Sequence, residues 1–132
     1  MELVIRFMKA IFSMKTPWPL WVALLMVLNM IAPIFFIETL EAKVVLISTL
    51  AGAGLMILLF YKYGFVRLLG TGHIFWVPVV IWLGSRFSEF SFETPFEIWV
   101  LSIMVFNSHS LVLDLMDVVR YINGDRKPMV AV

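Results

Sequence analysis

Long apolar stretches with almost no charge make up most of this 132-residue chain. Apolar residues account for 62% of the sequence and charged residues for only 14%. A soluble domain of this size exposes too much of its surface to hide so many apolar side chains. Lipid is therefore the expected solvent for most of them, and the chain has room for four membrane-spanning helices of about 20 residues each.

Four stretches fit this requirement: residues 20–37, 44–61, 68–83 and 96–119. They predict an all-α fold, an integral-membrane four-helix bundle that forms a single transmembrane domain over residues 1–132. The chain has no cysteine, which excludes disulfides and thiolate chemistry. It also lacks the basic stripe of a nucleic-acid-binding protein, so the lipid bilayer is the expected partner and nucleic acid is not.

Residues 2–14 precede the first stretch and are amphipathic. Polar residues recur there at helical spacing, namely Glu2, Arg6, Lys9 and Ser13, and apolar residues fill the other side. Short basic helices of this kind lie in the headgroup region of a bilayer. This segment is therefore predicted to be an amphipathic interfacial helix.

The basic residues are unevenly distributed among the segments that connect the apolar stretches. Most of them fall on the side of the N-terminus: Arg6, Lys9, Lys15, Lys62, Arg67, Arg120, Arg126 and Lys127. Lys43 and Arg86 fall on the opposite side, together with most of the acidic residues. Since Lys and Arg mark the cytoplasmic side, both termini are predicted to be cytoplasmic.

The last apolar stretch carries polar residues at intervals of three or four: Asn107, Ser110, Asp114, Asp117 and Tyr121. This spacing places them on one helix face. Such a face is unfavourable against lipid, so it is expected to turn toward the bundle. His109 lies about 160° around the helix from Asn107 and requires a different partner or a water-filled cleft.

The helical rise sets the relative depth of these groups. With Arg120 at the inner interface, Asp114 lies about 9 Å deeper. His73 follows Arg67 by six residues and reaches about the same depth on the antiparallel neighbour. A His73–Asp114 pair is therefore predicted, while Asp117 is expected to reach Arg120 or the interface itself.

Small residues in the middle stretches indicate helix-packing positions: Ser48, Gly52, Gly54, Gly70 and Gly72. Glycines in the third stretch indicate either a close helix contact or a locally broken helix. Pro33 lacks an N–H and frees the carbonyl of Asn29, so a local kink is predicted there. The Asn29 amide is expected to hydrogen-bond between helices.

Two functions are compatible with the polar face. The favoured one is that it fixes helix register and partner choice in a non-enzymatic accessory or interaction subunit, packed as a homo-oligomer or against a larger membrane-protein partner. The alternative is a proton- or ion-conducting bundle whose relay consists of His73, His109, Asp114 and Asp117. No spacing typical of a metal site and no nucleophile–base pair is found, so no catalytic residue, metal or cofactor is predicted.

Several short motifs from Asn29 onward form a recognisable pattern: Ala32-Pro33, Leu40-Glu41-Ala42, Gly64-Phe65, Arg67-Leu68-Leu69-Gly70, Gly72-His73-Ile74, Trp76-Val77-Pro78 and Asp117-Val118-Val119-Arg120-Tyr121. The pattern resembles a family of small four-span bacterial inner-membrane proteins of uncharacterised function. The resemblance covers most of the chain. It implies a bacterial inner membrane and no particular activity.

Overall fold

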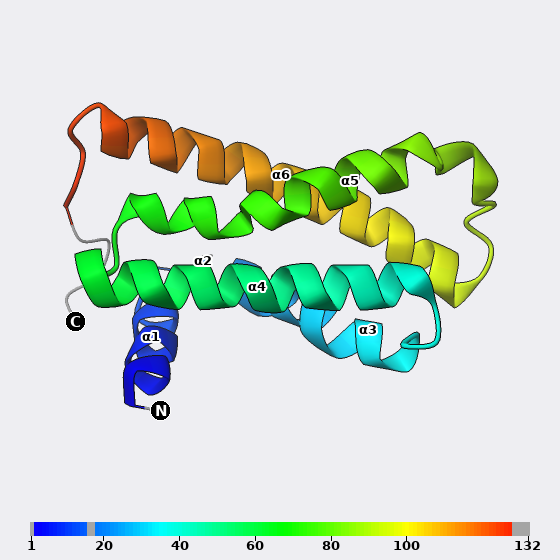
Figure 1. Ribbon diagram of the computed structural model, residues 1–132, viewed down its shortest axis with the longest axis horizontal. Coiled ribbons are helices and arrows are strands. Elements are labelled where there is room, and N and C mark those ends of the chain that lie inside the picture. The colour runs from blue at the N-terminus through cyan, green and yellow to red at the C-terminus, as the bar shows by residue number, and fades with distance from the viewer. Residues whose placement is uncertain (1, 16–17, 128–132) are drawn as a thin grey trace.

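The computed structural model describes residues 2–15 and 18–127, and this part of the chain is helical and contains no strand. Four segments are long and apolar enough to cross a membrane: Trp18–Phe35, Leu40–Tyr63, Arg67–Ser85 and Pro95–Ile122. They run side by side along one axis (Figure 1). The all-helical fold with four long apolar segments is therefore confirmed, with boundaries close to those predicted.

The helix α1 (Glu2–Phe12) precedes these segments and runs across the axis of the bundle (Figure 1). Its buried residues Phe7 and Ile11 pack in a cluster with Phe60 and Phe65. The ring centroids of Phe7 and Phe60 are 5.4 Å apart. The amphipathic helix expected over residues 2–14 is thus present, and it is docked on the bundle by one of its faces.

The first apolar segment is interrupted near Pro33, where the sequence predicts a kink. It consists of α2 (Trp18–Met26), a π-helical turn η1 (Val27–Ile31) and α3 (Ala32–Phe35). The N–H of Ala32 donates to the carbonyl of Val27, five residues earlier. In that register the next carbonyl, that of Leu28, would pair with residue 33, and proline has no N–H to donate.

The indole of Trp99 takes the place of the missing donor. Its Nε1 lies 2.8 Å from the Leu28 carbonyl oxygen, and the side chain is only 6% exposed. We expect Trp99→Phe to lower the free energy of unfolding by about 1 kcal/mol or more, because the buried carbonyl loses its partner. Thermal unfolding in detergent micelles measures this loss. Trp18→Phe, at an exposed position, is the matched control and should leave the midpoint unchanged.

The helix α4 (Leu40–Tyr63) is uninterrupted and has a defined residue at each end. The Thr39 hydroxyl accepts a hydrogen bond from the Ala42 N–H at its start. Gly64, with φ of 80°, ends it in a conformation that favours glycine. The helix α6 (Pro95–Ile122) begins in a similar way, with Thr94 accepting a hydrogen bond from the Glu97 N–H.

The third segment is a 3₁₀-helix, η2 (Arg67–Phe75), followed by α5 (Trp76–Ser85). A 3₁₀-helix rises about 2.0 Å per residue instead of 1.5 Å. The segment therefore spans about 33 Å, which exceeds the thickness of a hydrocarbon core of about 30 Å despite its short sequence. The locally irregular helix expected around Gly70 and Gly72 is confirmed in this form.

The apolar core is divided between the two ends of the bundle. One cluster surrounds Val100 and Ile103 of α6, and the other surrounds Phe60 and Phe65 near α1. At the end with the first cluster, Nη1 of Arg86 lies 2.7 Å from Oε1 of Glu41. This bond raises the pKa of Arg86 above its ordinary value, so the guanidinium stays charged. The short helix η3 (Phe87–Glu89) then leads toward α6.

Candidate functional site

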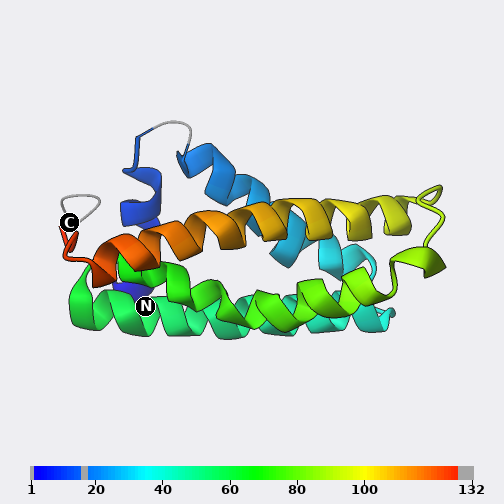
Figure 2. The same cartoon turned by 90° about the horizontal axis from the view of Figure 1, so that it is seen from above.

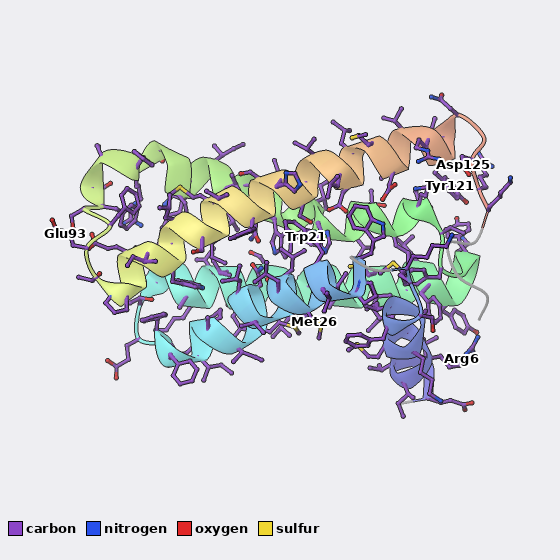
Figure 3. All side chains as sticks on the ribbon, turned by 180° about the vertical axis from the view of Figure 1, so that it is seen from behind. Arg6, Trp21, Met26, Glu93, Tyr121 and Asp125 are labelled. Carbon is purple, nitrogen blue, oxygen red and sulfur yellow. The ribbon has the colours of Figure 1, made fainter. Side chains whose placement is uncertain are left out.

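The polar face of α6 turns into the bundle, as its spacing predicts. Asn107 and Ser110 are buried, with 0% and 2% of their surface exposed. The side chains of Asp114 and Asp117 are 18% and 33% exposed. Exposure therefore increases along the face toward the end of the bundle where Tyr121 and Asp125 lie (Figure 3).

The 3₁₀-helix η2 is wedged between α4 and α6, and glycines make this possible. A Cβ built on Gly52 would lie 2.4 Å from the carbonyl oxygen of Gly72. A Cβ on Gly70 would lie 3.1 Å from the backbone oxygen of Asp114. The close contacts expected of Gly52, Gly70 and Gly72 are therefore present. Gly54 is different, because nothing lies within 4 Å of its Cβ position.

The wedge brings His73 of η2 against Asp114 of α6. Nδ1 of His73 lies 2.5 Å from Oδ2 of Asp114, so the predicted pair is present. The imidazole also stacks on Trp76, with ring centroids 4.2 Å apart and an interplanar angle of 1°. The indole of Trp76 donates to Oγ1 of Thr49 on α4 at 3.1 Å. Two hydrogen bonds and one aromatic stack thus connect α6, the η2–α5 segment and α4.

Asp117 contacts a different residue from the one predicted. Its Oδ1 lies 2.6 Å from Nη1 of Arg67 at the start of η2. Arg120 instead contacts Asp125 at 2.8 Å, and Asp125 also accepts from Nε of Arg67 at 3.2 Å. Of the two alternatives predicted for Asp117, the contact with Arg120 is wrong, because Arg67 on the neighbouring helix is closer and more buried. The alternative that Asp117 reaches the interface stays a prediction. The C-terminal segment is held against η2 through Asp125.

A pair of asparagines deeper in the bundle was not predicted as a pair. Asn29 and Asn107 exchange two hydrogen bonds, of 3.0 and 2.8 Å, and both residues are fully buried. The Asn29 amide also donates to the Leu25 carbonyl at 2.9 Å. The interhelical hydrogen bond expected of Asn29 is confirmed, and its partner lies at the deep end of the polar face of α6.

His109 lies outside this network, as its position on the helix predicts. It is exposed, and its ring meets Trp21 edge to face with centroids 5.2 Å apart. The two rings line a groove of about 450 Å³ whose other walls are apolar. The partner of His109 is therefore an aromatic ring, and the polar cleft considered for it is not found among the described residues.

The level of Asp114 follows from the same groove. Trp18, at the start of α2, and Leu113 of α6 both line it. His109 packs on Trp21, and Asp114 lies five residues further along α6, about 7.5 Å at 1.5 Å per residue, so it lies near the level at which α2 begins. His73 shares this level through its contact with Asp114. The helices α4, η2 and α6 extend beyond the start of α2 toward the end of the bundle at which α1 lies (Figure 2).

The buried polar side chains of residues 2–15 and 18–127 find their hydrogen-bond partners within the chain. Every fully buried side-chain nitrogen or oxygen in the described residues has a hydrogen-bond partner. Three or more histidine, aspartate or glutamate side chains do not gather into a metal-binding group anywhere in residues 2–15 and 18–127. Ser102 of α6 donates to the backbone carbonyl of Ile98 on its own helix. The network can therefore hold three helices together, and His73 with Asp114 can share a proton.

The chain matches no family model, no curated protein and no solved structure.

Proposed function

We propose that this chain is a four-span protein of the bacterial inner membrane, with both termini in the cytoplasm, and that it acts as a non-enzymatic accessory or interaction subunit. The four apolar segments support a multi-pass membrane protein. The excess of Lys and Arg at the end that holds both termini supports the orientation. The motifs from Ala32-Pro33 to Tyr121 support a bacterial inner membrane through their resemblance to that family.

One observation carries the functional part of the proposal: the polar groups of α6 are paired with named residues of the same chain. Asn107 pairs with Asn29, Asp114 with His73, and Asp117 with Arg67. Networks that are satisfied in this way fix helix register and rigidify a bundle. The exposed apolar exterior of the bundle, for example at Ile47, Leu58 and Leu115, then supports lateral contact with a membrane protein or a second copy.

Proton or ion conduction is the competing function, favoured by the partial exposure of the pair. The side chains of His73 and Asp114 are 20% and 18% exposed, which leaves them within reach of water at one end of the bundle. From there, however, the described contacts continue to the paired amides of Asn29 and Asn107 and to apolar residues.

A flux assay separates the two functions. In liposomes loaded with a pH-sensitive dye, we expect the full chain to carry no proton flux above that of protein-free liposomes. The Asp114→Asn variant should behave identically. In parallel, purification in a mild detergent should yield a stoichiometric partner or a defined homo-oligomer. A wild-type flux that Asp114→Asn or His73→Ala abolishes would establish conduction, and a monomer without partner would refute the interaction role.

A further inference from the structure

The end of the bundle that carries both termini has two flanks that differ in how their cations are paired. On the α6 flank, Arg67 and Arg120 contact the carboxylates of Asp117 and Asp125. On the α1 flank, no described carboxylate lies within ion-pair distance of any of the basic residues: Arg6, Lys9, Lys15 and Lys62. Positive charge is therefore concentrated on the α1 flank.

Arg6 and the last turn of α4 belong to the same surface. The guanidinium carbon of Arg6 lies 5.8 Å from the ring centroid of Phe60. Lys62 follows Phe60 by two residues, and its Nζ lies 5.3 Å from the ring centroid of Tyr63. Figure 3 shows Arg6 on α1 at the same end as Asp125 but on the other side of the bundle. Arg6 thus lies against the last turns of α4, the helix end that also carries Lys62.

The 3.6-residue period divides α1 into three sectors. The first sector is docked on the bundle and consists of Phe7, Ala10 and Ile11. The second sector is polar and consists of Glu2, Arg6, Lys9 and Ser13. The third sector is apolar yet 39%, 48% and 54% exposed, at Val4, Ile5 and Phe12 respectively. A helix that packs on a protein and otherwise faces water has one apolar sector and one polar sector. The second, exposed apolar sector of α1 therefore indicates contact with another apolar environment besides the bundle.

We propose that α1 and the last turn of α4 form a binding surface for anionic phospholipids. Arg6, Lys9 and Lys62 contact the lipid phosphates, and the exposed apolar sector of α1 enters the boundary of the acyl chains. This inference rests on the proposed insertion in a membrane. It adds a preference for anionic over zwitterionic lipid, located on one flank.

Two features favour a lipid over other anionic ligands. A soluble anion or an acidic protein would use the cations but would leave the adjacent apolar sector in water, whereas a bilayer boundary satisfies both sectors at once. The helix also runs across the bundle axis at its end, which is the orientation of a helix lying in the plane of an interface (Figure 1). Because α1 is already docked through Phe7 and Ile11, lipid binding need not fold it.

Lipid titration of the purified full chain, followed by native mass spectrometry, tests the proposal. Phosphatidylglycerol and phosphatidylcholine with identical acyl chains are the two probes. We expect the wild-type chain to bind phosphatidylglycerol more tightly. Each cation near an anionic surface contributes about fivefold, the equivalent of about 1 kcal/mol. The Arg6→Gln/Lys9→Gln double variant should therefore lose at least fivefold in affinity for phosphatidylglycerol and nothing for phosphatidylcholine.

The matched control is Arg126→Gln/Lys127→Gln, which removes the same charge from the C-terminal segment at the same end of the bundle. It should retain the preference for phosphatidylglycerol. Equal binding of the two lipids by the wild type, or an equal loss in the two double variants, would overturn the proposal. Displacement of the lipid by excess inorganic phosphate would also overturn it, in favour of a free-phosphate site.

Extraction of reconstituted vesicles with alkaline carbonate tests insertion separately. We expect the chain to stay in vesicles made of phosphatidylcholine alone, because the four spans do not depend on the headgroup charge. Release from these vesicles would contradict the membrane-spanning proposal itself. Retention without any preference for phosphatidylglycerol would contradict the lipid-binding inference alone.

Discussion

Replacement of Gly52 by alanine is expected to lower the free energy of unfolding by about 3 kcal/mol, at the upper end of the cost of overpacking. The added methyl group would lie 2.4 Å from the carbonyl oxygen of Gly72. The Gly72 oxygen is a backbone atom, and the position of a Cβ is fixed by its own backbone, so neither can rotate away. The helices α4 and η2 must therefore separate, which also disturbs the contact between the Trp76 indole and Thr49.

Gly54→Ala is the matched control on the same helix. It lies two residues further along, nothing occupies the space within 4 Å of its Cβ position, and alanine is the better helix former. Its stability should be unchanged or higher. Gly72→Ala should fall between the two, because its methyl group first meets the flexible side chain of Met56. Thermal unfolding in one detergent ranks the three variants, and equal midpoints for Gly52→Ala and Gly54→Ala would refute this packing.

Most of the secondary structure could be predicted from the sequence because lipid requires long apolar helices. The polar face of α6 could also be predicted, since its spacing is a property of one helix. The pairing of His73 with Asp114 required in addition that two neighbouring helices be antiparallel, which the short connections indicate. Each of these predictions depends only on the residue spacing within one helix, or within two helices that are adjacent in the sequence.

The remaining contacts depend on the rotation of each helix about its axis, which apolar periodicity does not determine in a chain that is apolar on nearly all sides. Asn29 and Asn107 lie in the first and last segments, and nothing in their local spacing relates them. Arg67 reaches Asp117 because η2 is a 3₁₀-helix and Gly70 lets it approach α6 closely. The 3₁₀ geometry itself could be anticipated only as an irregularity around the two glycines.

The contact between Trp99 and Leu28 shows why Pro33 predicts a missing backbone donor but not which carbonyl lacks it. Pro33 predicts a missing donor, and the helical register places the freed carbonyl at Asn29. The structure contains a π-helical turn before the proline, so the carbonyl without a backbone donor is that of Leu28. The displacement by one residue follows from the π-helical register, and the donor to this carbonyl is a tryptophan of another helix, which sequence periodicity could not associate with this position.

His73→Ala is expected to be the most destabilising substitution in the polar network. It leaves the carboxylate of Asp114 at the helix interface with its closest partner removed, and breaking a buried pair in this way costs about 3–5 kcal/mol. Because the two side chains are 20% and 18% exposed, water compensates part of this, and we expect a loss of about 2 kcal/mol. The stacking of the imidazole on Trp76 is lost as well.

The double variant His73→Ala/Asp114→Asn isolates the contribution of the charge. Both variants lack the imidazole and its stacking, so their difference reports only the carboxylate. A neutral amide is less costly to leave unpaired than a carboxylate. We therefore expect the second substitution to restore part of the lost stability, while Asp114→Asn alone has a smaller effect than His73→Ala. Unfolding midpoints of the wild type and the three variants complete the cycle. A double variant less stable than His73→Ala would show that the Asp114 carboxylate is stabilised by groups other than His73.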